Sequence, residues 1–180
     1  MSKTQEAPGE LERVREFVNS ADIEAGTDEL SSPAALGSWL ATRGLRPGGA
    51  TREDLRRAIE LREALREVLL AHTNRLAVPA QASAALNQAA QRARLQLRFD
   101  EQAAAVLEPE ASGVTGALGR LLAIVSGAIA DGSWERLKAC REHSCEWAFY
   151  DHTKNRSGAW CTMDVCGNRA KARAYRERRQ

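Results

Sequence analysis

The chain has 180 residues, of which 43% are hydrophobic and 28% charged, a composition typical of a folded globular protein and not of a disordered one. The formal net charge is only +2, but from Trp134 onward eleven lysines and arginines face six acids, whereas the first 133 residues hold fifteen against eighteen. A basic end on a mildly acidic body favours an anionic partner that is met at one end, and nucleic acid is the leading candidate.

The start of the chain is polar, and residues 1–9 are predicted to form a flexible tail. This segment has no apolar core, so we do not interpret it as a signal peptide. The longest apolar run, Val114 to Ala130, is interrupted by Arg120 and contains several glycines, which favours a buried helix over a membrane span. We therefore expect a cytoplasmic protein with no membrane partner.

Apolar residues recur at helical spacing in three segments of the first half, which begin near Leu11, Pro33 and Thr51. Ser32 can cap the second helix, which should end near Arg43. Thr51 followed by acidic residues is a favourable start for the third.

The third helix keeps a 3.6-residue apolar period as far as His72. Its arginines at 56, 57, 62 and 66 alternate with glutamates, so we expect them on a solvated outer face with i,i+4 pairs. His72 ends the apolar line and is expected to be a satisfied residue at the rim of the core, not a ligand.

The second half continues with a helix from Pro79 to about Arg92, then a strand over 95–99 that could return over 103–107 across a turn at Asp100 and Glu101. The apolar helix 114–130 follows and ends at Asp131. Ser133 should begin a short helix that delivers Cys140. The sequence therefore predicts a mainly α fold with one small hairpin, in which a helical domain spans 10–131 and a small C-terminal finger spans 132–180.

All four cysteines lie in this last segment, as two matching pairs whose members are each separated by four residues, with fifteen residues between the pairs. Two short loops that each bring two thiolates are the common way to hold a tetrahedral Zn²⁺, and a reducing compartment favours such a site over disulfides. Two disulfides or a redox-sensing zinc site are the competing uses of these thiols. The predicted ligands are Cys140, Cys145, Cys161 and Cys166.

Four cysteines would fill the tetrahedron and leave no position for water or substrate, so we expect one structural zinc and no enzyme. His143 and His152 lie nearby but are surplus to the site. Four aromatic residues should shield the thiolates, or alternatively stack on exposed bases: Trp147, Phe149, Tyr150 and Trp160.

The basic tail, residues 167–179, contains alanines that favour a helix, and we expect its cations to contact phosphate. A simply solvated helix end is the alternative. Gly167 and Asn168 tolerate left-handed backbone, which a chain leaving a metal site often needs. The predicted DNA contacts are Lys154, Arg156, Arg169, Lys171, Arg173, Arg176, Arg178 and Arg179.

The run from Cys166 to Arg169, together with the aromatic residues before it, resembles the CGNR zinc finger, a bacterial C-terminal module regarded as DNA-binding. The segments 16–20, 26–30 and 39–41 are similar to the opening of the ABATE domain, a family of stress-induced transcription regulators that is the usual partner of this finger. Many such fingers carry basic residues where this chain has Gly158 and Ala159, so any phosphate contact made there is missing here.

The resemblance implies a bacterial DNA-binding transcription regulator, whose N-terminal domain would sense a small-molecule effector or form a homodimer. The chain has no nucleophile motif and no phosphate-binding loop, and its three histidines are scattered. Two alternatives remain open at this point: a protein-interaction adaptor whose finger docks an acidic partner, and an RNA-binding module that uses the aromatic cluster.

Overall fold

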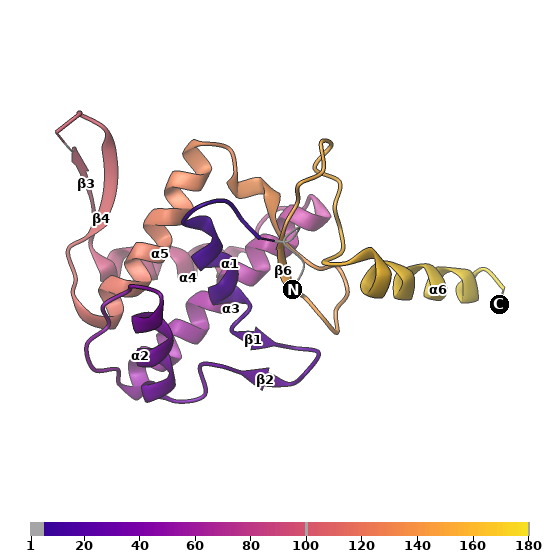
Figure 1. The fold of residues 1–180 in the computed structure, drawn as a ribbon, viewed down its shortest axis with the longest axis horizontal. Helices are drawn as coiled ribbons and strands as arrows, with labels where there is room; N and C mark the ends of the chain where they lie inside the picture. Colours follow the sequence, from indigo (N-terminus) through magenta and orange to yellow (C-terminus); the bar gives the residue numbers. More distant parts are fainter. Residues whose placement is uncertain (1–5, 100, 180) are drawn as a thin grey trace.

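The computed structural model describes residues 6–99 and 101–179, and helices make up most of this part of the chain (Figure 1). The mainly α class predicted from the sequence is confirmed. The α-helices are α1 (Leu11–Val18), α2 (Pro33–Thr42), α3 (Arg52–Asn74), α4 (Ala80–Ala93), α5 (Gly113–Ala130) and α6 (Asn168–Glu177). A 3-10 turn, η2 (Trp134–Arg136), and a π-helical turn, η3 (Met163–Gly167), lie in the finger.

Short antiparallel hairpins complete the described part of the chain. They pair β1 (Ala21–Asp22) with β2 (Thr27–Asp28), β3 (Leu95–Phe99) with β4 (Ala105–Pro109), and β5 (Leu137–Ala139) with β6 (Ala148–Tyr150). The sequence predicted only the second of these, because strands of two or three residues are too short to show an alternating pattern. Asp100, in the predicted turn, lies outside the described residues.

The starts of two helices follow the predicted capping chemistry. The Ser32 hydroxyl accepts a hydrogen bond from the Ala35 N–H at 3.1 Å. At the start of α3, the Thr51 hydroxyl accepts from the Asp54 N–H at 3.1 Å, and the Asp54 carboxylate accepts from the Thr51 N–H at 2.9 Å. This reciprocal pair satisfies backbone donors that a helix start otherwise leaves free.

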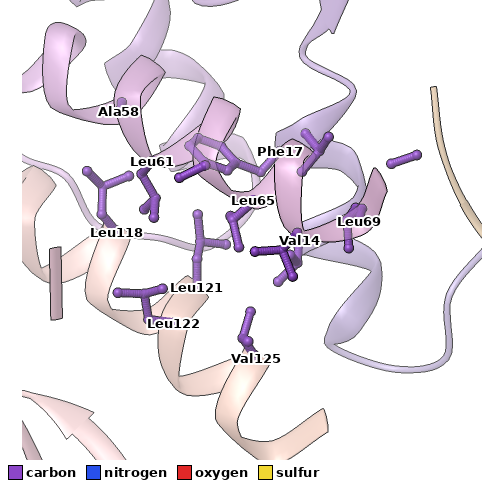
Figure 2. Close-up of a cluster of buried hydrophobic side chains, with 14 of the residues drawn as sticks. Val14, Phe17, Ala58, Leu61, Leu65, Leu69, Leu118, Leu121, Leu122 and Val125 are labelled. Atoms are coloured by element: carbon purple, nitrogen blue, oxygen red, sulfur yellow. The ribbon is translucent and has the colours of Figure 1, made fainter. Parts of the chain in front are cut away.

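Side chains from α1, α3 and α5 converge in the hydrophobic core (Figure 2). Phe17, Leu65 and Leu121 come from these three helices and are fully buried. By length and composition α5 could cross a membrane, but here it is a core helix, as predicted. It approaches its neighbours closely: a Cβ on Gly119 would lie 2.6 Å from the Ala93 Cβ.

The finger shares this core. Leu137, Ala139 and Ala148 are completely buried and belong to the same hydrophobic cluster as the helices. The prediction of a short helix that begins at Ser133 is wrong, because a single 3-10 turn is followed at once by β5. All three residues of β5 are buried, and the strand pairs with β6 in place of continuing a helix.

The predicted tail of residues 1–9 needs a similar correction, apart from residues 1–5, which are outside the described residues. Ala7 is buried, and its N–H donates to the Glu12 carboxylate at 2.7 Å. The Glu6 carbonyl is 3.0 Å from Nε2 of His152, in the finger. The segment just before α1 is therefore held against the body by a local hydrogen bond to Glu12 and by a contact with His152, which is far from it in the sequence.

Two arginines of α3 that were expected on a solvated face are buried instead. Arg62 and Arg66 are 3% and 2% exposed. Arg62 makes a bidentate ion pair with Asp28, with both N–O distances at 2.8 Å, which ties the β1–β2 hairpin to α3. The prediction was wrong because the far side of α3 is itself covered, by the hairpin and by the finger.

Candidate metal centre and nucleic-acid interface

The four cysteines are delivered by two turns of the finger. Cys140 directly follows β5, and its N–H donates to the Trp147 carbonyl at 2.9 Å, which extends the β5–β6 hairpin. Cys145 closes the turn between these strands, with its N–H bonded to the Glu142 carbonyl at 2.8 Å. Cys161 and Cys166 lie at the far end of the following loop, before and within η3.

The four sulfur atoms all lie within 4.8 Å of one another. Cys161 is 3.7 Å from both Cys145 and Cys166, measured between the sulfur atoms. A tetrahedron with Zn–S bonds of about 2.3 Å has edges of about 3.8 Å, so these separations fit one structural Zn²⁺. They are too long for disulfides, whose sulfurs are about 2.05 Å apart. The metal prediction is confirmed, and neither His143 nor His152 belongs to the group.

Crowding of the sulfurs perturbs their titration. Hydrogen bonds from the Cys145 and Cys161 thiols lower the pKa of Cys140 to about 2, and the contact with Cys140 raises the pKa of Cys145 to about 12. Contact with both also raises the pKa of Cys161, and burial raises the pKa of Cys166. A divalent metal allows all four to ionise and releases protons on binding.

Two of the four predicted shielding residues cover the thiolates. Trp147 and Trp160 pack against the cysteine cluster. Tyr150 packs against the main core instead, and Phe149 is buried within β6. The aromatic residues of the finger therefore serve both the metal site and the junction with the helices.

A buried ion pair organises the long loop of the finger. Lys138 and Asp151, whose side chains are 4% and 1% exposed, are 2.7 Å apart. The Asp151 carboxylate also accepts from the N–H groups of Thr153 and Gly158. Burial alone would raise the pKa of Asp151, but these hydrogen bonds, the one from Lys138 first, lower it to about 2. A Cβ on Gly158 would lie 2.9 Å from this carboxylate, so the position must stay small.

Polar side chains from the helical domain hold the finger in place. Asn19 pairs with the backbone of Ala148 in both directions: its amide donates to the carbonyl at 2.9 Å and its oxygen accepts from the N–H at 2.7 Å. Arg66 donates to the Val18 carbonyl at 2.7 Å and to the Glu146 carbonyl at 3.0 Å. Sequence reasoning missed these roles. The available signal was a polar Asn19 directly after the apolar end of α1.

The basic tail forms α6, as predicted, and this helix has no buried residue and projects from one end of the molecule (Figure 1). The expected left-handed backbone at Gly167 and Asn168 is wrong, because both adopt right-handed helical conformation and lead directly from η3 into α6. Gly167 is small for another reason: a Cβ there would lie 2.7 Å from the Met163 sulfur.

The eight cations predicted to contact DNA fall into two groups. Three are held by carboxylates: Arg156 by Glu135 at 2.8 Å, Arg169 by Glu24 at 2.6 Å, and Arg173 by Glu142 at 2.6 Å. The ion pair of Arg169 fastens the start of α6 to the β1–β2 hairpin, and that of Arg173 fastens it to the turn between Cys140 and Cys145. Within the described residues, no ion pair engages the other five, which are exposed: Lys154, Lys171, Arg176, Arg178 and Arg179.

Comparison with known families divides the chain at nearly the same place. Residues 12–132 match the ABATE family, described as "Putative stress-induced transcription regulator". Residues 136–179 match the CGNR zinc finger. No curated protein matches the chain.

Proposed function

Because the chain belongs to the ABATE family and ends in a CGNR zinc finger, we propose that it is a cytoplasmic transcription regulator that binds duplex DNA through α6 and the loop beside the metal site. The proposed role is not enzymatic, since four cysteine ligands leave zinc no open position for substrate. The zinc would hold the finger in shape, and the exposed cations would meet the phosphates.

The arrangement of α6 is the observation that carries this proposal. The helix directly follows η3, which ends at Gly167. The ion pairs of Arg169 and Arg173 fix its first turns to the body. Lys171, Arg176 and Arg178 are exposed along this helix and just beyond its end. A helix that is anchored at one end and whose exposed charges are mainly cationic, with Glu177 as the one acid in the segment 168–179, suits a long anionic partner.

Fluorescence anisotropy of the zinc-loaded protein on a labelled duplex, titrated across salt, tests the proposal. If the five unpaired cations each meet a phosphate, log K should fall with log salt with a slope of about −4.5. The double variant Lys171→Gln/Arg178→Gln should bind more weakly and make this slope shallower by about 1.8. A chelator should abolish binding, because the turn that carries α6 depends on the metal.

Arg52→Gln is the matched control, because Arg52 is an exposed cation at the start of α3, outside the finger. This variant should bind the duplex like the unmodified protein. Absence of binding at low salt would refute the proposal, and α6 would then be sought as a docking site for an acidic protein. An unchanged salt slope in the double variant would remove α6 from the interface.

A groove on the finger favours single-stranded nucleic acid as a second candidate. It has a volume of about 680 Å³ and is lined by Tyr150, His152, Trp160 and Met163, beside the loop that carries Lys154. Aromatic walls next to cations are typical of sites that stack unpaired bases. Tighter binding to a labelled single strand than to the duplex, with His152→Ala weakening mainly the single-strand binding, would support this candidate. If His152→Ala weakens binding to the single strand and to the duplex equally, the candidate is excluded.

A further inference from the structure

The β3–β4 hairpin lies at the opposite end of the molecule from α6 and extends away from the helices (Figure 1). Its register places Leu97 opposite Leu107 and Phe99 opposite Ala105, so one face of the hairpin is apolar. Yet Leu97 is 59% and Phe99 67% exposed. The inner end of the hairpin packs on the core through Leu95, so the uncovered part of the apolar face is its outer end, and an exposed apolar patch of this kind marks an interaction surface.

A groove of about 630 Å³ separates this hairpin from α5 and the segment before α1. Its apolar walls include Leu97 and Val106 from the hairpin and Ile124 from α5. Gly127 of α5 also lines it, and a Cβ built there would meet no atom of the chain within 4 Å. A glycine in a helix interior is destabilising relative to alanine, and here, unlike at Gly119, no contact within the chain requires it.

We propose that a second copy of this chain occupies the groove, with the hairpins of two protomers packed against each other's α5 about a twofold axis. In such an isologous dimer the same patch serves on both sides, and each Gly127 gives the partner's hairpin room to approach. This inference does not rest on DNA binding, since it concerns the end of the molecule opposite α6.

The charges at the rim favour a second copy over other occupants. Two acids and two arginines line an adjoining hollow that shares Leu107, Ala123 and Ile124 with the groove: Glu10, Arg13, Glu108 and Arg120. Glu10 pairs with Arg13 and Asp131 also lines the groove, so charges of both signs surround it, which two copies can match across a twofold axis. Such a rim would repel part of any partner with one dominant sign, such as nucleic acid or an acidic protein.

The exposed apolar area also fits a dimer. The large apolar side chains on this end of the molecule are between 40% and 67% exposed: Leu97, Phe99, Val106 and Ile129. Together they present on the order of 350 Å². A stable interface buries about 800 Å² per partner, somewhat more than half of it apolar. These four residues, of which Leu97 and Val106 line the groove and Phe99 and Ile129 lie outside its lining, supply most of the apolar share.

Sedimentation velocity of the full-length, zinc-loaded protein without DNA tests the proposal. Protein concentrations from about 1 to 100 μM cover the range in which an interface of this size should form a dimer. The expected result is a concentration-dependent species of twice the 19.7 kDa chain mass. A protein that stays monomeric over this range would overturn the proposal, and the groove would then be left to a small molecule or another protein.

Three variants locate the interface. Phe99→Glu and Gly127→Glu should each weaken dimerisation at least about tenfold, because each would bury an unpaired charge. Gly127→Glu is the safer variant for folding, since the position faces open space. The matched control is Leu76→Glu, at an apolar side chain that is 70% exposed after the end of α3, outside the groove. If Phe99→Glu or Gly127→Glu dimerises as strongly as the unmodified protein, the assigned surface is refuted. It is also refuted if Leu76→Glu loses dimerisation to the same extent.

Discussion

Replacement of Asn19 by alanine tests how firmly the finger is joined to the helical domain. Asn19 is 7% exposed and Ala148 is completely buried. The substitution removes the only hydrogen bond of the Ala148 N–H among the described residues and leaves its carbonyl with a long contact of 3.5 Å to Arg15. A buried polar group without a partner costs about 1–3 kcal/mol, so with the carbonyl partly satisfied we expect a loss of about 2–4 kcal/mol.

Urea denaturation of the zinc-loaded protein measures this loss. Far-UV circular dichroism would report the helices, and tryptophan fluorescence would report mainly the finger, which contains three of the four tryptophans. Both signals should shift to lower urea together, because Leu137, Ala139 and Ala148 belong to the core of the helical domain. Asn87→Ala, at an exposed position in α4, should change stability by less than about 0.5 kcal/mol.

Two results would contradict this reasoning. A loss below about 0.5 kcal/mol would mean that the paired hydrogen bonds contribute no more than an ordinary surface contact. A separate early transition in fluorescence, with the helical signal unchanged, would mean that the finger unfolds independently and that the shared core does not couple the two parts.

The other predictions concern the finger and its contact with α3. Asp151→Asn should destabilise the protein by about 3–5 kcal/mol, because it leaves the buried Lys138 ammonium without its carboxylate; a normal denaturation midpoint would contradict this. Cys161→Ser should reduce bound zinc below one ion per chain and lower the melting temperature of the helices through β5, as measured by metal analysis and circular dichroism; full zinc content would remove Cys161 from the ligand set. His72 has a pKa below its usual 6.5 because it is buried, although the Leu137 carbonyl at 2.9 Å opposes this. The unfolded chain therefore takes up the proton first, and the stability of the unmodified protein should fall as pH drops below 6.5. His72→Gln should lose that part of the pH dependence, and parallel stability curves for the two proteins would exclude the effect.

Much of this protein follows from local sequence. Helix α3 begins at Thr51 because the capping groups are three residues apart, and the cysteines could be assigned to one metal because two short loops bring their thiols together. The basic helix also follows from a short stretch of chain. In each case the interacting groups are neighbours in sequence or belong to one repeated spacing, so the pattern itself carries the physical information.

Tertiary structure decided which charges are available. Arg62 and Arg66 lie in the same alternating run as the exposed Arg56, but their partners Asp28 and Glu146 are 34 and 80 residues away.

The same holds in the basic tail, where Arg169 and Arg173 hold carboxylates while Lys171 between them has no ion pair in the described part of the chain. The sequence by itself therefore determined helices α1 to α6, the zinc ligands and the sign of the basic end. Only the fold decided which cations fasten the molecule together and which remain free to bind, because a charge is neutralised by whichever group packing brings within about 4 Å, however distant in sequence.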